Sequence, residues 1–201
     1  KKNTSVFGSR TAMELKGIPC SSLEPHQAKR KNCCVSRSFG VKVTKLEELN
    51  EAVTTHCLNA AEKIRSDKQT VKKITVFIRT SPFQTKSNYY ANSQDIDLPI
   101  RTNDSITLIK EALNALKSIY KVGYRYQKTG IILSGLKDVD IYNKNLFSEI
   151  NNDEKRIQLM KAIDHTNFKY GRNALSVAQA GFKKKWDTKK QHDSKVDTAC
   201  F

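Results

Sequence analysis

The chain has 201 residues, and its 36 lysines and arginines outnumber its 20 aspartates and glutamates, giving a formal net charge of +16 at pH 7. This surplus favours a polyanionic partner, and charge alone does not choose between nucleic acid and an anionic membrane. The sequence contains no run of about 18 apolar residues and no charged segment followed by an apolar core, which excludes a readable membrane span or signal peptide and predicts a cytoplasmic protein.

The first predicted elements are a strand and a helix. Residues 24–32 have the charged and polar composition of a linker, and a strand follows over residues 34–41. Apolar residues then recur at spacings of three and four over residues 46–64, behind a Thr-x-x-Glu capping box that begins at Thr44. This spacing predicts a helix with one buried face.

Two further strands are predicted from alternation. Apolar side chains alternate with others over residues 74–79, and Ser81-Pro82 ends the run. A second alternation covers residues 96–100 and includes Pro99. Because proline cannot donate a hydrogen bond to a neighbouring strand, this segment is predicted to be an edge strand.

A second helix is predicted to begin near Asp104, a suitable N-cap, and to stop at Gly123, which suits a left-handed C-terminal cap. Residues 124–133 then return as a strand. The order strand, helix, strand, strand, helix, strand is the split β-α-β arrangement. We therefore expect an α+β fold in which a four-stranded sheet carries two helices on one face and leaves the other face open.

The C-terminal part is predicted to be a small helical extension. Residues 135–152 are polar and irregular, and a helix is expected over residues 153–168, ahead of Gly171. The last thirty residues include the run Lys183-Lys184-Lys185-Trp186. Two interpretations of this end stay open, a basic arm or a frayed and solvated chain end.

The sequence predicts no catalytic residue and no metal ligand. Asp138-Val139-Asp140 lacks a third carboxylate nearby and is typical of a turn. The vicinal Cys33 and Cys34 would point to opposite faces of a strand, which favours packing over chemistry. The sequence has no C-x-x-C pair, which excludes the common zinc signatures. The number of cysteines is odd, which argues against a disulfide framework. The five cysteines are Cys20, Cys33, Cys34, Cys57 and Cys200.

Donor side chains on three predicted strands indicate how an anion is bound. Neighbouring strands lie about 5 Å apart, so an open sheet can meet several phosphates of a DNA backbone at once. Such contacts grip without reading sequence. The alternative is that these are surface residues of any basic protein. The candidate DNA-binding residues are Ser36, Arg37, Ser38, Arg79, Thr80, Arg125 and Lys128.

Several longer motifs resemble one family. In chain order, SRSFG, AAEKIRS, FIRTSPF followed by YYANS, GYRYQKTGIIL and NLF are similar to the C-terminal half of the UmuC family, within the Y family of translesion DNA polymerases. The similarity runs from about residue 11 to residue 186. It implies a little-finger domain of β-α-β-β-α-β fold that grips the backbone of damaged primer-template duplex during error-prone SOS DNA repair.

The resemblance also implies a division of the chain into five parts. They are the end of a thumb-like helical segment at 1–23, a linker at 24–32, the little finger at 33–137, a clamp-binding linker at 138–152 and a C-terminal extension at 153–201.

The palm and fingers of the family, with their metal-binding carboxylates, have no counterpart in this sequence. We therefore expect that the chain does not polymerise DNA alone, and that it holds no cofactor because Mg²⁺ belongs to the absent palm. The first residue is Lys1 and not Met, which indicates either a piece of a longer polymerase or a truncated relative.

Residues 143–147, NKNLF, lie where the family has a sliding-clamp-binding peptide, ordinarily Gln-Leu-x-Leu-Phe. The resemblance implies that Asn143, Leu146 and Phe147 bind the clamp. Asn143 and Lys144 depart from the family pattern, which predicts weaker binding. The alternative is an apolar Leu-Phe pair that packs against the domain.

The resemblance of the C-terminal extension implies contacts with UmuD′ or with the RecA filament. Two functions are therefore kept. The first is a DNA-gripping and clamp-targeting part of a translesion polymerase. The second is a protein-interaction module that docks to the clamp, UmuD′ or the RecA filament and has little DNA affinity of its own.

Overall fold

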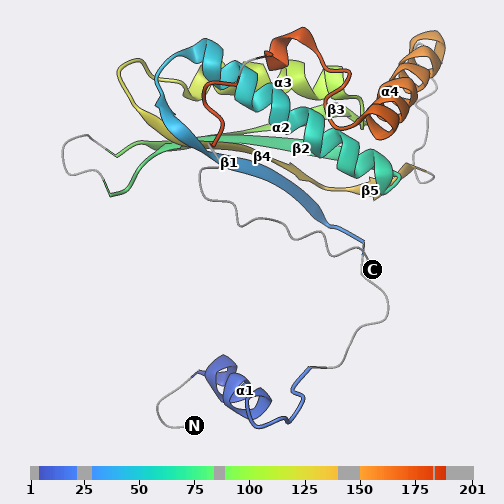
Figure 1. Cartoon of the computed structure of the whole chain (residues 1–201). Coiled ribbons are helices and arrows are strands. Elements are labelled where there is room, and N and C mark those ends of the chain that lie inside the picture. Colours follow the sequence, from blue (N-terminus) through green and yellow to red (C-terminus); the bar gives the residue numbers. More distant parts are fainter. Residues whose placement is uncertain (1–4, 22–28, 84–88, 140–149, 183, 189–201) are drawn as a thin grey trace.

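The computed structural model describes residues 5–21, 29–83, 89–139, 150–182 and 184–188 (Figure 1). The helices are α1 (Val6–Glu14), α2 (Leu46–Ser66), α3 (Ser105–Ile119), α4 (Ile150–Tyr170) and the short 3₁₀ helix η2 (Ala178–Ala180), and the strands are β1 (Asn32–Val43), β2 (Gln69–Thr80), β3 (Ala91–Thr102), β4 (Tyr126–Ser134) and β5 (Lys137–Asp138).

The strands form one antiparallel sheet in the order β1-β4-β2-β3, and β5 pairs with the first residues of β2. The α+β class and the predicted order of the four long strands and two helices are confirmed, whereas the short strand β5 lies in a segment that was predicted to be irregular. The strand that contains Pro99 lies at an edge, as predicted, because among the described strands β3 pairs with β2 alone. The order of strands in the sheet was not predicted, since it depends on contacts between segments far apart in the chain.

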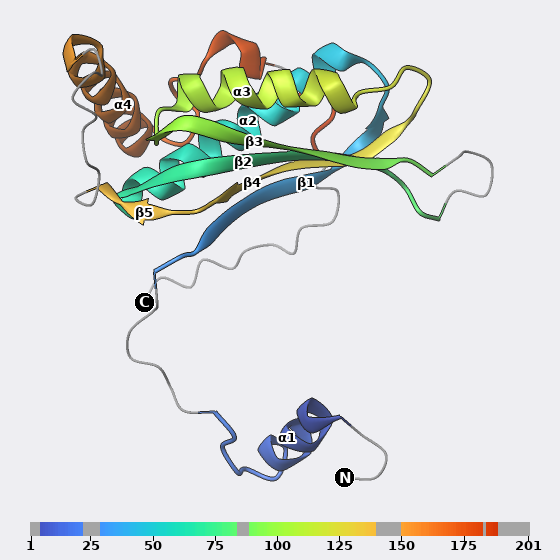
Figure 2. The same cartoon turned by 180° about the vertical axis from the view of Figure 1, so that it is seen from behind.

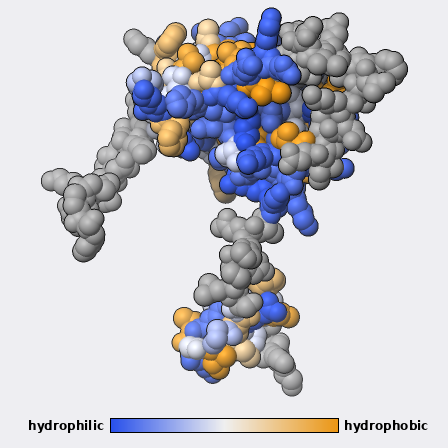
Figure 3. Space-filling model, turned by 90° about the vertical axis from the view of Figure 1, so that its right-hand side faces the viewer, coloured by the Kyte–Doolittle hydropathy of each residue, from blue (hydrophilic) through white to orange (hydrophobic). Residues whose placement is uncertain are grey.

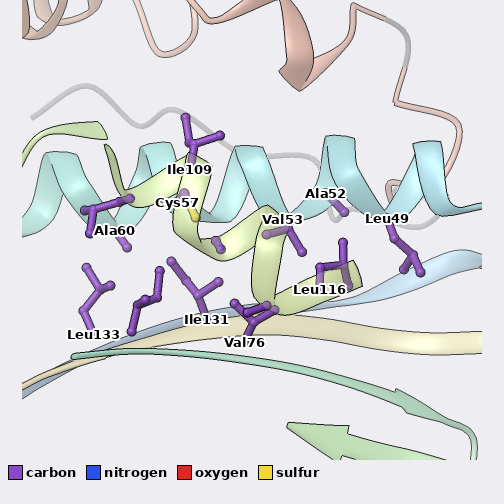
Figure 4. Close-up of a cluster of buried hydrophobic side chains, with 14 of the residues drawn as sticks. Leu49, Ala52, Val53, Cys57, Ala60, Val76, Ile109, Leu116, Ile131 and Leu133 are labelled. Carbon is purple, nitrogen blue, oxygen red and sulfur yellow. The ribbon is translucent and has the colours of Figure 1, made fainter. Parts of the chain in front are cut away.

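Helices α2 and α3 cover the same face of the sheet, as predicted (Figure 2). Helix α2 lies over β1 and β4, and α3 lies over β2 and β3. Their apolar sides meet every second residue of the central strands, including Val76, Ile131 and Leu133 (Figure 4). The core therefore sits between two helices and one face of the sheet, and none of the helices in the described residues covers the other face. In the described ranges, no helix is both long and apolar enough to cross a membrane.

Two predicted helix ends were wrong. Thr44 does not cap α2: the N-cap is Lys45, which makes no side-chain capping hydrogen bond, and the carbonyl of Thr44 accepts a hydrogen bond from the Tyr120 hydroxyl. Helix α3 ends at Ile119 and not near Gly123, because Tyr120 already has an extended backbone with ψ 136°. Gly123 has φ +91° in the turn that leads to β4.

The start of α3 agrees with the sequence and also anchors α4. Asp104 is the N-cap, and its carboxylate accepts hydrogen bonds from the amides of Ile106 and Thr107. The same carboxylate forms a 2.6 Å ion pair with Arg156 of α4. One side chain therefore caps α3 and holds the C-terminal helix against the domain.

A second ion pair fixes α4 to the end of α2. Arg65 contacts both carboxylate oxygens of Asp164 at 2.7 and 2.8 Å, and its remaining nitrogen donates to the carbonyl of Asn103 and the hydroxyl of Ser105, each at 2.8 Å. Bidentate pairs of this kind are among the stronger charged contacts in proteins.

Seen from the side of α4 and β5, the described surface is mostly hydrophilic with separate small apolar patches (Figure 3).

The chain after α4 returns to the domain. We call residues 177–182 and 184–188 the C-terminal strap. Its Trp186 is 3% exposed and meets the rings of Phe39 and His56 edge-on, at centroid distances of 5.9 and 6.2 Å. The amide of Gly40 in β1 donates to the carbonyl of Trp186 at 3.0 Å. For these residues the interpretations of a free basic arm and of a frayed end were wrong, because Trp186 is buried against the domain. The sequence did not indicate this packing, since a single buried tryptophan produces no hydrophobic periodicity.

Two glycines let the strap approach closely. A Cβ atom on Gly40 would lie 2.6 Å from the carbonyl oxygen of Asp187, and one on Gly181 would lie 2.8 Å from the carboxylate carbon of Glu51 in α2. Gly181 also has φ +67°, which side-chain-bearing residues rarely adopt. The strap can therefore follow α2 and the end of β1 only with glycine at both positions.

Substituting Trp186→Ala should lower the free energy of unfolding by about 3–5 kcal/mol, because it leaves a cavity against Phe39 and His56. Urea unfolding of the whole chain measures this. Lys185→Ala, at an exposed neighbouring position, is the control and should change stability by less than about 0.5 kcal/mol. An unfolding midpoint that is the same for Trp186→Ala and the parent would contradict the packing of the strap.

Candidate nucleic-acid interface

The register of the central strands sorts the predicted binding residues by face. Ser38 of β1 is opposite Lys128 of β4, which is opposite Arg79 of β2. These three residues, which we call the basic row, alternate with the buried residues of their strands and lie on the open face. Ser36 lies on the same face, one step along β1.

Arg37 is not on the open face. It is opposite Thr129, which in turn is opposite Ile78, and both of these residues are buried under the helices. Its side chain is exposed at the β1 edge of the helix-covered side, near His56. The expectation that Ser36, Arg37 and Ser38 present donors together on the open sheet was wrong, because consecutive residues of a strand point to opposite faces.

Thr80 is buried, and its hydroxyl is hydrogen-bonded to the backbone of Tyr90. It is 2% exposed, and its hydroxyl accepts a 2.9 Å hydrogen bond from the amide of Tyr90 and also contacts the Tyr90 carbonyl at 3.3 Å. Arg125 is exposed and immediately precedes β4, which begins at Tyr126 and not at Tyr124 as predicted. Arg125 therefore lies beyond the basic row, at the same end of the sheet.

The open face is electrically uneven along its strands. Lys73, near the start of β2, lies 3.8 Å from a carboxylate oxygen of Asp95 and 3.7 Å from one of Asp97. Among the described residues, Arg79 and Lys128 form no such ion pair. The cations of the basic row are thus not neutralised by a neighbouring carboxylate of the described chain, whereas Lys73 is.

The clamp-binding candidates Asn143, Leu146 and Phe147 lie outside the described residues, as does Asp140 of the D-x-D pair. Asp138, the other member of that pair, forms a 2.6 Å ion pair with Lys29. Within the described ranges, no three His, Cys, Asp or Glu side chains are grouped so that they could hold a metal ion.

Cys33 and Cys34 lie on opposite faces of β1, as the sequence predicts. Cys33 is 4% exposed in the core, and Cys34 is exposed on the opposite face of β1. Burial raises the pKa of the Cys33 thiol and of the Cys57 thiol. A raised pKa keeps a thiol protonated and unreactive at neutral pH, so both side chains serve the core.

Sequence reasoning missed two features beside the basic row. Phe77 is opposite Gly130 on the open face, and its position was readable from the alternation of β2, which places it out of step with the core residues Val76 and Ile78. The other feature is the strap, whose Thr188 hydroxyl contacts the carbonyl of Ser38 at 3.3 Å. No spacing in the sequence indicated that contact.

Comparison with known proteins gives two matches to families. Residues 30–146 match the impB/mucB/samB family C-terminal domain, and residues 158–201 match a domain of unknown function (DUF4113).

Individual relatives are similar over nearly the whole chain. The proteins UmuC and ImpB of Salmonella typhimurium are each 36% identical to it over 191 residues, and MucB of Escherichia coli is 34% identical over 191 residues. Each alignment covers 95% of this chain and 45% of the relative. The chain therefore spans less than half the length of these relatives.

His56 should make the free energy of unfolding depend on pH. Burial, reinforced by Arg37 and Lys184 and opposed by Asp187, lowers the pKa of His56 to about 4 from its usual 6.5. Between these values the unfolded chain binds a proton that the folded chain does not, so the free energy of unfolding should fall by about 3 kcal/mol as the pH drops from 6.5 to 4.

Urea unfolding at pH 7 and at pH 4.5 measures this effect. His56→Gln should lose less stability than the parent over the same interval, and His165→Gln, at an exposed position, should lose as much as the parent. The assignment would be refuted by an acid sensitivity that His56→Gln leaves unchanged.

Proposed function

The chain belongs to the impB/mucB/samB family, and we propose that it is the duplex-gripping C-terminal part of a UmuC-type translesion DNA polymerase. The observation that carries this proposal is the basic row on a sheet face that no helix of the described residues covers. Because the chain spans 45% of relatives such as UmuC, nucleotide transfer is proposed to belong to the part of the polymerase that this chain does not include.

The spacing of the basic row suits a sugar-phosphate backbone. Ser38, Lys128 and Arg79 stand on three adjacent strands, and neighbouring strands are about 5 Å apart. Long cationic side chains at that spacing can reach successive phosphates of one nucleic-acid strand, and the serine hydroxyl can donate to a phosphate oxygen. Such contacts hold a duplex whatever its sequence, as bypass of damaged bases requires.

The electrostatics of the chain point the same way. The net charge of +16 attracts a polyanion over long range, and the uneven face directs the polyanion to the end with Arg79, Lys128 and Arg125. Lys73 contributes less, because Asp95 and Asp97 lie beside it. We propose that the duplex crosses β1, β4 and β2 at the basic row and stays away from the acidic part of β3.

Clamp targeting is the second part of the proposal. Asn143, Leu146 and Phe147 lie in the sequence where the family domain at 30–146 gives way to the segment that matches at 158–201. A short peptide whose apolar pair enters a pocket on a ring-shaped clamp would keep the polymerase near the primer end.

A protein-interaction module is the alternative, and one observation favours it. Phe168 of α4 and Phe182 of the strap are 90% and 99% exposed, and exposed aromatic side chains are common in protein interfaces. UmuD′ and the RecA filament are the partners that this alternative names.

Arg79→Ala and Lys128→Ala should each reduce the slope of log K against log salt concentration by about one, because each removes one phosphate contact. Fluorescence anisotropy with a labelled DNA duplex at several salt concentrations measures the slope. Lys110→Ala, which removes an exposed charge from α3 on the other side of the sheet, is the matched control.

The salt slope of Arg37→Ala tests whether the DNA contacts the open face or the helix-covered face. The sequence alone predicts that it behaves like Arg79→Ala, whereas its place on the helix-covered side predicts a smaller change of slope. Binding that ignores salt in the parent chain, or equal slopes for Arg79→Ala and Lys110→Ala, would refute the proposed grip.

The double substitution Leu146→Ala and Phe147→Ala should abolish capture by an immobilised sliding clamp, because the apolar anchors of the peptide are lost. DNA binding by the same variant should be unchanged, which distinguishes a lost clamp contact from unfolding. Clamp capture that persists in the double variant would exclude this peptide as the clamp contact.

A further inference from the structure

Phe77 is an aromatic residue on the open face of the sheet. It occupies the strand row next to Arg79, in which Ser36 of β1, Gly130 of β4 and Phe77 lie opposite one another. It does not belong to the buried hydrophobic cluster, which lies on the other face. Its side chain is partly exposed, so the structure raises the question of what an apolar ring does there.

Gly130 determines where the ring lies. A Cβ atom on Gly130 would be 2.6 Å from Cζ and 2.8 Å from Cε1 of Phe77, and 2.3 Å from Cβ of Ser36. The far end of the ring therefore rests on the backbone of β4. Glycine in a central strand weakens the sheet and often marks a close approach of another group, and here that group is Phe77.

The surroundings of the ring define an apolar centre on the open face. Ile132 of β4 lies between Cys34 of β1 and Thr75 of β2 in the next row on the same face, and Ile132 is half-buried. The basic row lies on one side of this centre. On the other side, Lys73 is paired with Asp95 and Asp97.

We propose that Phe77 packs against the deoxyribose of the strand whose phosphates contact the basic row, and that this contact makes the face prefer DNA over RNA. The inference rests on the proposed function and names its ligand more closely. In a nucleic-acid backbone the sugars lie between the phosphates, as the apolar centre lies beside the basic row.

The chemistry of the two sugars supplies the preference. A deoxyribose presents an apolar CH₂ group at its 2′ position, which the ring can cover and remove from water. A ribose places a hydroxyl there, and a phenyl ring offers that hydroxyl no hydrogen-bond partner, so covering it costs free energy. This preference for deoxyribose over ribose does not depend on the positive charges that bind the phosphates.

The test compares Phe77→Ala with the parent on a labelled DNA duplex and on an RNA duplex of the same sequence, which contains no deoxyribose, by anisotropy at several salt concentrations. Phe77→Ala should weaken binding to the DNA duplex by about tenfold, as expected for the loss of a small apolar contact. It should affect binding to the RNA duplex much less and leave the salt slope unchanged, because a neutral side chain releases no counterions. Arg79→Ala, in the next row of the same strand, is the control and should lower the slope on both duplexes.

The possible outcomes separate this inference from the proposed function. Equal affinity of Phe77→Ala and the parent, with the Arg79→Ala effect intact, would mean that the ring covers the sheet or meets a protein and would overturn the inference alone. Equal losses on both duplexes would also overturn the sugar preference. Salt-independent binding by the parent would refute both proposals.

Thermal unfolding of each variant shows whether it is folded. If Phe77→Ala is unfolded, Phe77→Leu takes its place, since leucine still covers Gly130 but offers a smaller apolar surface. It should weaken binding to the DNA duplex by about threefold with an unchanged slope. An affinity equal to that of the parent would again overturn the inference.

Discussion

The fold depends on the alternation of side chains in the two central strands. β2 and β4 place Val76, Ile78, Ile131 and Leu133 on one side, where burial under α2 and α3 supplies the main stabilisation. Because the side-chain period of a strand is two, a slip of one residue would bring these side chains into water. The same constraint therefore fixes which residues remain on the open face, and the candidate interface is a consequence of the core.

This constraint also explains how far the sequence could predict the structure. The class, the element order and the edge position of the Pro99 strand follow from local patterns, and all were predicted. Strand order follows from long-range pairing that no local pattern contains. The side on which Arg37 lies could be predicted from the sequence, because it lies an even number of positions from Cys33, Val35 and Phe39, which face the core. The prediction instead treated Ser36, Arg37 and Ser38 as one group of donors. The site of Trp186 was not readable, since its pocket is formed by α2 and β1.

In the proposed DNA grip, the open face would combine two kinds of attraction that respond differently to conditions. Ionic contacts with phosphates weaken as salt is added, whereas apolar contacts do not. A binding surface with cations at one end and an apolar centre beside them can hold a duplex loosely enough to move along it and still keep a preference for its chemical type. Asp95 and Asp97 of β3, which lie opposite the first half of β2, limit this surface to part of the sheet, so its extent is set by repulsion as well as by attraction.

The strap has a consequence for how this part of the protein can be recombined. Two separately recognised sequence families meet in this chain, at residues 30–146 and 158–201, yet Trp186 from the second is packed in the core of the first. A chimaera joined between them would exchange Trp186, a buried residue of the core that the two segments share. It would fold well only if the incoming segment brought an aromatic residue that fits beside Phe39 and a glycine that clears Glu51. The boundary visible in sequence is thus not a boundary of packing, and the smallest exchangeable unit includes both segments.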